Sequence, residues 1–186
     1  MNRIRSAGLA IALATAALAA PPDPSSPERE RAKAAMGSLQ SGLLARLQEE
    51  LRSGGPAAAV GVCRDEAPAI AARVAAEHGV ELGRTSHRLR NPVNAPREWA
   101  RATVEAGAGK SAADVDVVQI DLGERIGFLR PIPTAEACLQ CHGPADRLAA
   151  DVRERIATAY PRDRATGFAA GELRGWMWAE VPKIAR

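Results

Sequence analysis

Residues 115–142 read VDVVQIDLGERIGFLRPIPTAEACLQCH, and this stretch decides the fold. Two apolar runs, residues 115–122 and 126–131, flank a turn at Gly123, which predicts two neighbouring strands. A further strand is predicted at residues 175–181, close to the C-terminus. We therefore expect the second half of the chain to form a small antiparallel sheet, with a pair of cysteines directly after its second strand.

The N-terminal half has a helical pattern. Apolar residues recur at three- and four-residue spacing over residues 36–51, which predicts a helix that opens at Glu28 and ends at Gly54 and Gly55. A second helix is predicted over residues 56–77, with a kink at Pro68. Shorter helices are predicted at residues 96–106 and 147–160, whereas residues 84–96, RTSHRLRNPVNAP, have the chemistry of turns. The expected fold class is therefore α+β, with long N-terminal helices before the sheet.

The first residues predict export. Arg3 and Arg5 precede an uncharged apolar run over residues 7–17, and Ala17-Leu18-Ala19 fits the small-residue rule for signal peptidase. The run is too short to span a bilayer as a stable helix, although an uncleaved anchor is the alternative. We expect a signal peptide at residues 1–19, a linker and helix start at 20–34, and one folded domain at 35–186. The expected location is periplasmic, with no stable membrane insertion after cleavage.

Charge does not indicate a nucleic-acid partner. The whole chain has 25 Lys and Arg against 22 Asp and Glu, a formal net charge of +3. Two of these positive charges lie in the predicted signal peptide, so the exported part is nearly neutral. Nucleic acid is therefore not an expected ligand, since its binding relies on a strongly basic surface.

Cys138-Leu139-Gln140-Cys141-His142 is the C-x-x-C-H pattern of c-type haem attachment. In this pattern two thiols reach the vinyl groups of one porphyrin, and the adjacent imidazole ligates the iron. A thioredoxin-like redox pair or a plain disulfide are the alternatives. A zinc site would need two more ligands, and the whole chain has only three His and three Cys. We expect one covalent haem c, held by Cys138 and Cys141 and ligated by His142.

The third cysteine, Cys63, lies on the apolar face of the predicted second helix. A buried cysteine often acts as a small apolar side chain. The alternative is that its thiolate binds the iron opposite His142. The other candidates for this sixth ligand are His78, His87, Met36 and Met177.

Four blocks of sequence together resemble a known family. They are VGVCRDEAP, GRTSHRLRNPVNAP, LRPIPTAEACLQCHG and YPRDRATGFAAGELRG, and their order and spacing are similar to those of domain-of-unknown-function family 3365. The resemblance covers most of the chain from about residue 36 to residue 181. It implies an exported single-haem protein with a PAS-like fold and a Cys/His axial pair. It therefore implies Cys63 as the distal ligand and His142 as the proximal ligand.

The same resemblance points to residues around the haem. Arg84, Arg90 and Asn91 fall on the family's R-T-S…R-N-P-x-N block. The two arginines could pair with the two haem propionates through charge-assisted hydrogen bonds. The alternative is a structural loop in which asparagine side chains bond to the backbone.

The expected function is a haem-based redox or gas sensor that signals to a periplasmic redox or signalling protein. A periplasmic electron-transfer cytochrome is the alternative, because one haem suffices to carry one electron. An enzyme is not expected, since two strong axial ligands leave no open position on the iron. The sequence also has no Ser-His-Asp set and no phosphate-binding loop.

Overall fold

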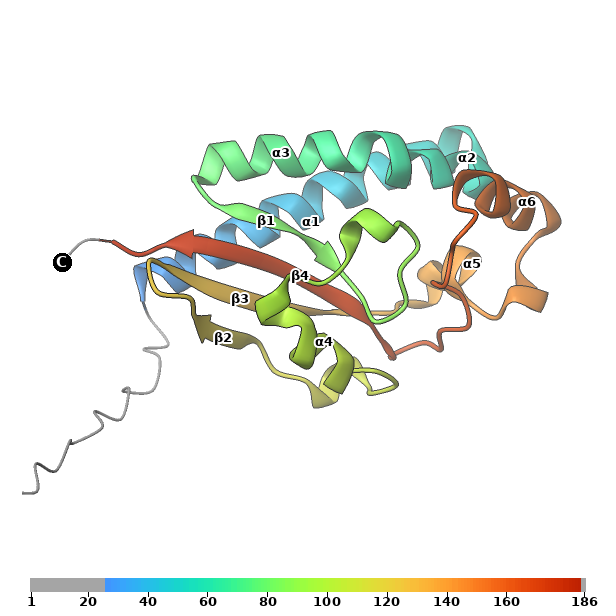
Figure 1. Cartoon of the computed structure of the whole chain (residues 1–186). Helices are drawn as coiled ribbons and strands as arrows, with labels where there is room; N and C mark the ends of the chain where they lie inside the picture. The colour runs from blue at the N-terminus through green and yellow to red at the C-terminus, as the bar shows by residue number, and fades with distance from the viewer. Residues whose placement is uncertain (1–25, 185–186) are drawn as a thin grey trace, which may run out of the picture.

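A four-stranded antiparallel sheet organises the chain, for which the computed structural model describes residues 26–184 (Figure 1). The strand order is β1-β4-β3-β2. The strands are β1 (Glu81–Thr85), β2 (Val118–Asp121), β3 (Arg125–Pro133) and β4 (Leu173–Pro182). The predicted class, helices with a small antiparallel sheet, is confirmed, and the PAS-like assignment stays a prediction.

Two helices, α1 (Pro27–Ser53) and α3 (Ala67–His78), cover one face of this sheet (Figure 1). Ser26 caps α1 by accepting a hydrogen bond from the Arg29 main-chain N–H, and the helix ends at Gly54 as predicted. Side chains that alternate along β4 pack under these helices, because successive strand residues point to opposite faces. The buried residues of this core are Ala32, Ala35, Met36, Leu39, Val74, Val80, Leu82, Phe128, Met177, Ala179 and Val181.

The predicted second helix consists of three parts. Helix α2 (Gly55–Gly61) leads into a π-helical turn (Val62–Glu66), and α3 follows it directly. Pro68 lies in the first turn of α3, where the missing N–H is tolerated, so the interruption precedes the proline instead of occurring at it. The kink expected at Pro68 is thus replaced by the π-helical turn, which contains Cys63. Such turns are frequent at functional sites.

The opposite face of the sheet is covered by α4 (Arg101–Ala106) and the 3-10 turn before it (Glu98–Ala100). The core here consists of Ala100, Val104, Leu129, Leu173 and Trp176. The hairpin of β2 and β3 is confirmed, although residues 115–117 stay outside β2. Further 3-10 turns are Pro92–Asn94 and Ala112–Asp114.

Strand β1 was not predicted, because its sequence appeared to open a polar loop. It pairs with β4, and Gly83 lies opposite Trp178. A Cβ atom at Gly83 would come within 2.8 Å of the Trp178 indole, so the two strands can pair only where the side chain is absent. The expected turn region therefore begins after Thr85.

At one end of the sheet, α5 (Leu139–His142) and α6 (Ala150–Ala159) lie beside α2 (Figure 1). The 3-10 turns Glu136–Cys138 and Ala145–Arg147 lead into this region. A third buried cluster, Val60, Leu148, Val152, Ile156 and Tyr160, joins α2 to α6. The C-x-x-C-H motif therefore lies at one end of the sheet, beside the start of the π-helical turn.

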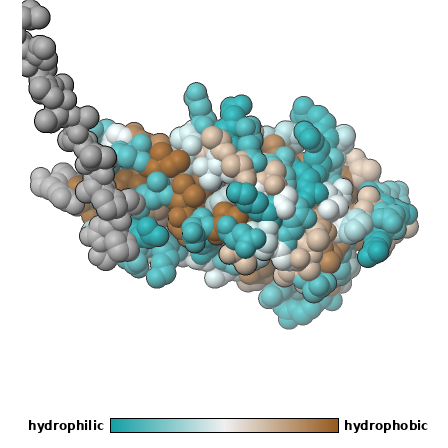
Figure 2. Space-filling view, turned by 90° about the horizontal axis from the view of Figure 1, so that it is seen from below, coloured by the Kyte–Doolittle hydropathy of each residue, from teal (hydrophilic) through white to brown (hydrophobic). Residues whose placement is uncertain are grey.

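The side of the molecule seen from below carries apolar surface toward the end of the sheet away from α5 and α6 (brown in Figure 2). Within residues 26–184 no helix is both long and apolar enough to cross a bilayer. The predicted signal peptide at residues 1–19 lies outside the described residues.

Candidate functional site

The C-x-x-C-H motif forms the short helix α5, which brings its side chains to the end of the sheet. The Cys141 thiol packs against the α2–α6 cluster, and this burial raises its pKa. Cys63 interacts electrostatically with it, so the third cysteine lies close to the motif. All three cysteines are free thiols, which gives no support to the disulfide alternative.

His142 is held in one orientation by the main chain of a distant segment. Its Nδ1 donates a hydrogen bond to the Ala165 carbonyl at 2.7 Å, and its ring meets the Phe168 ring edge-on. A carbonyl only accepts, so the proton is on Nδ1 and Nε2 keeps its lone pair. Burial, then the nearby Arg174 and Arg90, hold the pKa of His142 well below its usual range. A neutral imidazole with Nδ1 bonded to a carbonyl is the form in which histidine binds metals.

Hydrogen bonds of Arg90 connect the C-x-x-C-H motif to the segment of residues 163–165, which contains the partner of His142. Its Nε donates to Asp163 at 3.1 Å, and its Nη2 donates to the Cys141 carbonyl at 2.5 Å and the Ala165 carbonyl at 3.3 Å. The side chain is only 9% exposed. The expected propionate contact of Arg90 stays a prediction, but the geometry gives its guanidinium three partners within the protein.

Cys63 lines a cavity of about 420 Å³. The π-helical turn and the start of α3 form one wall, and Arg84 from β1 and Asn91 from the following loop form the other. Three of the predicted site residues therefore surround one cavity, whereas Cys138, Cys141 and His142 are not part of its lining. The volume is in the range of small-molecule pockets.

Asn91 contacts its own loop. Its side-chain oxygen accepts a hydrogen bond from the Val93 main-chain N–H at 3.2 Å, which caps the turn Pro92–Asn94. This is the structural alternative considered from the sequence, and it leaves the amide nitrogen of Asn91 for the cavity.

The other candidates for a second ligand are held elsewhere. His78 contacts Ser38 Oγ through Nε2 at 3.0 Å, and Met36, on α1, is buried in the core between the helices and the sheet. Met177 accepts a hydrogen bond from Arg130 at its sulfur. None of these three lines the cavity beside Cys63.

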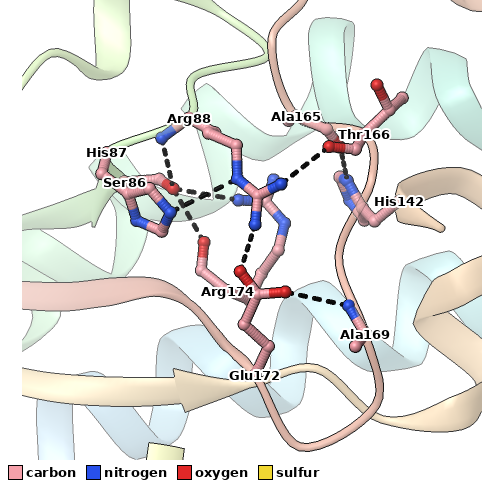
Figure 3. Close-up of polar contacts among 9 residues, drawn as sticks. All are labelled: Ser86, His87, Arg88, His142, Ala165, Thr166, Ala169, Glu172 and Arg174. Atoms are coloured by element: carbon pink, nitrogen blue, oxygen red, sulfur yellow. Dashed lines mark hydrogen bonds and ion pairs between the residues drawn. The ribbon is translucent and has the colours of Figure 1, made fainter. Parts of the chain in front are cut away.

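His87 belongs to a polar network that includes Ser86 and Arg88 (Figure 3). Its Nε2 accepts a hydrogen bond from Arg88 at 3.3 Å, and Arg88 lies 3.6 Å above the Phe168 ring. Arg88 also donates to the Thr166 carbonyl and forms an ion pair with Glu172. The His87 ring meets the same Phe168 as His142 does, so the aromatic ring contacts both imidazoles.

Sequence reasoning missed two residues of the site. Tyr160 was interpreted as part of a turn, but it is buried at the end of α6, where burial and then Cys63 raise its pKa to about 12. Its phenol therefore stays protonated near neutral pH and faces the region of Cys63. Arg174, on β4, is the second, and Figure 3 shows it beside Ser86.

Arg174 donates a hydrogen bond to Ser86 Oγ at 3.3 Å, and Ser86 Oγ donates to the Arg174 carbonyl at 2.8 Å. Burial, then the neighbouring Arg90 and Arg84, lower the pKa of Arg174 to about 10. Both missed residues lie within the sequence block YPRDRATGFAAGELRG, whose glycines suggested turns and obscured the chemistry of the other side chains.

Within residues 26–184, His, Cys, Asp and Glu side chains do not gather in groups of three or more that could hold a metal ion by themselves. The site's donors are instead single residues from separate elements, which suits a group that brings most of its own ligands. Haem is such a group, since its porphyrin leaves the protein only the axial positions.

Among solved structures, the chain is similar to the one titled "Crystal structure of the cyanobacterial heme-protein Tll0287". The TM-score is 0.53 at 24% identity, over 79% of this chain and 97% of that one, and this likeness concerns the fold. No curated protein matches the chain. A family model described as "Tll0287-like: Tll0287" matches residues 22–182, and this extent shows that the chain belongs to the Tll0287-like family.

Proposed function

We propose that this protein binds one haem covalently through Cys138 and Cys141, with His142 as an axial ligand of the iron. The observation that carries the proposal is the His142 imidazole, whose Nδ1 is fixed on the Ala165 carbonyl while Nε2 stays available. The solved structure of a haem protein with a similar fold supports it. The C-x-x-C-H spacing on a short helix supplies the two thiols for attachment.

Cys63 is the proposed second axial ligand. Its position near Cys141, in the wall of the cavity, supports this role over that of a core side chain. Tyr160 faces the same region with a protonated phenol, so it can donate a hydrogen bond to an anionic sulfur.

We propose that the protein acts as a haem-based redox or gas sensor. A bound haem supplies a one-electron redox centre and, when one axial ligand leaves, a position for a small gas. Cys63 lies in a π-helical turn between α2 and α3, so movement of this residue can be passed to a helix that packs on the sheet. A local charge change that biases a movable element is the usual basis of such switches. The proposed recipient is a periplasmic redox or signalling protein.

The attachment is tested by coexpression with a c-type haem maturation system, followed by denaturation and acid-acetone extraction. The haem is expected to stay with the wild-type chain and to be absent from Cys138→Ala/Cys141→Ala. Cys63→Ala is the matched control, because it also removes a thiol of the site but should keep the covalent haem. Extraction of the haem from the wild type contradicts the proposal.

The sensor role is tested by adding carbon monoxide to the reduced protein. A sensor is expected to bind the gas, since reduction weakens the bond between iron and an anionic sulfur. If the ferrous protein does not bind carbon monoxide and keeps both ligands, the gas-sensing role is excluded, and a redox sensor or an electron carrier is favoured.

A further inference from the structure

Three arginines from separate elements converge near His142. Arg84 comes from β1, Arg90 from the loop after it and Arg174 from β4. Arg90 donates to the Cys141 carbonyl next to His142, and Arg174 lies above the Phe168 ring, which meets the His142 ring edge-on. Arg84 also acts electrostatically on the imidazole and on Arg174. Asp163 is the carboxylate that acts on Arg174 there.

The carboxylate of Asp163 forms an ion pair with Arg90. Its two oxygens lie 3.1 Å from Arg90 Nε and 3.4 Å from Arg90 Nη2. Asp163 also accepts a hydrogen bond from the Ala165 main-chain N–H, so its position is fixed. This ion pair accounts for one of the three positive charges.

Arg84 and Arg174 have no such partner. Within the described part of the chain, no carboxylate oxygen lies at ion-pair distance from either guanidinium. Arg174 contacts only a neutral hydroxyl, that of Ser86, and the Phe168 ring, 4.9 Å from the guanidinium carbon. The other ionisable groups around Arg174 are the Cys63 thiol, the imidazoles of His87 and His142, and two arginines, Arg84 and Arg90.

The enclosed Arg174 guanidinium is costly without a carboxylate partner, because an uncompensated buried charge loses its hydration. Arg84 is half-buried and adds a second unpaired positive charge nearby. The low pKa of Arg174 expresses this cost. Natural proteins seldom keep such a charge unless an anion offsets it. The arrangement therefore fits a ligand that carries two separate negative charges.

We propose that Arg84 and Arg174 bind the two propionate carboxylates of the haem, one arginine to each. This inference rests on the haem binding proposed above. Haem has two anionic propionates, which match the two unpaired guanidinium groups in number and sign. Arg84 also lines the cavity beside Cys63, so it faces the volume in which a ligand would lie. A guanidinium can hold a carboxylate with two parallel hydrogen bonds.

The test is the pH dependence of the haem midpoint potential in the covalently loaded protein. In the wild type, both propionates should stay ionised, and the potential should change little between about pH 5 and 7. In Arg174→Gln, one propionate loses its partner and titrates in this range, above the ordinary carboxyl pKa of about 4.3. Its potential should be lower than that of the wild type at pH 7 and should recover as the pH falls.

Arg84→Gln should give the same pH dependence of the midpoint potential as Arg174→Gln. It is less prone to misfolding than Arg174→Gln, because Arg84 makes no hydrogen bond within residues 26–184 that the change would break. Arg174→Lys keeps the charge and should restore a nearly flat profile. Arg125→Gln is the control: its guanidinium is ion-paired with Glu81 at 3.0 Å and does not line the cavity, so its loss frees no propionate.

Resonance Raman spectra of the propionate bending bands provide a second readout. These bands should shift in Arg84→Gln and Arg174→Gln but not in Arg125→Gln. Loaded variants with the wild-type pH profile and unshifted bands overturn the inference while leaving haem binding intact. A wild-type chain without covalent haem overturns the proposed function instead, and the two failures are therefore distinguishable.

Discussion

The imidazole of His142, on α5, and the main-chain carbonyl of Ala165, in the loop after α6, are joined by a hydrogen bond of 2.7 Å. Asp163 fixes that carbonyl, because its carboxylate accepts the Ala165 N–H at 2.9 Å and binds Arg90 at the same time. The orientation of the proposed iron ligand thus depends on an ion pair two residues away from its hydrogen-bond partner.

Asp163→Ala should lower the free energy of unfolding by about 3–5 kcal/mol, the cost of leaving one member of a buried ion pair alone. The cost should be large here because Arg90 would then lie beside two further unpaired arginines. Urea denaturation measures the loss. Asp116→Ala is the control, since Asp116 is exposed and should change stability by less than about 0.5 kcal/mol. Equal losses in the two variants would contradict the role given to the ion pair.

His87 should make the stability depend on pH. Burial, and then Arg88, lower its pKa from the ordinary value of about 6.5. The unfolded chain therefore takes up a proton near that pH, while the folded chain stays neutral at this position. The contribution of His87 is fully present above about pH 6.5 and is lost as the pH falls below it.

The check is urea denaturation of His87→Gln and the wild type between pH 7.5 and 5.5. Glutamine keeps an acceptor for Arg88 but cannot gain a charge, so the variant should lose less stability over this range. If the free energy of unfolding changes equally with pH in the two proteins, His87 has the same pKa in the folded and unfolded states.

Much of the fold could be predicted because each element carries its own local signal. The leucine spacing defined α1, and the apolar runs around Gly123 defined the β2–β3 hairpin. The chain belongs to the Tll0287-like family, while the resemblance of the four sequence blocks to domain-of-unknown-function family 3365 and the single haem stay predictions.

The missed features depend on contacts between distant residues. Strand β1 has only Leu82 and Thr85 as buried residues and contains Gly83, so its sequence lacks the usual apolar alternation. Its stability comes from pairing with β4, which lies far along the chain. Arg174 was missed for the same reason, since its unpaired state is visible only once Arg84 and Arg90 lie beside it.

Gly83→Ala tests the close approach of β1 to Trp178. The added methyl group would lie 2.8 Å from the indole, so the strands or the ring must shift. We expect a loss of about 1–3 kcal/mol, typical of overpacking. Gly37→Ala is the matched control: no atom lies within 4 Å of the new Cβ, and the residue is inside α1. It should stabilise the protein by roughly 0.5–1 kcal/mol. Thermal unfolding of both variants checks the opposite signs.

Cys63→Ala should change the haem without unfolding the protein. If the Cys63 thiolate binds the iron opposite His142, the ferric spectrum of the wild type has thiolate character, and the variant should lose it. The midpoint potential should rise on the order of 0.1 V, because an anionic sulfur stabilises ferric over ferrous iron and axial ligands are a main determinant of haem potential.

A variant at Val62, a buried neighbour of Cys63, distinguishes iron ligation by Cys63 from its contribution to packing. Val62→Ala removes two methyl groups from a side chain that is 4% exposed in the same π-helical turn, so it should lower stability by roughly 1.5–3 kcal/mol. Its ferric spectrum should stay that of the wild type. Identical ferric spectra and potentials in Cys63→Ala and the wild type would mean that Cys63 is a core side chain. In that case the π-helical turn has no iron to respond to, and the sensor role loses the element that was proposed to move.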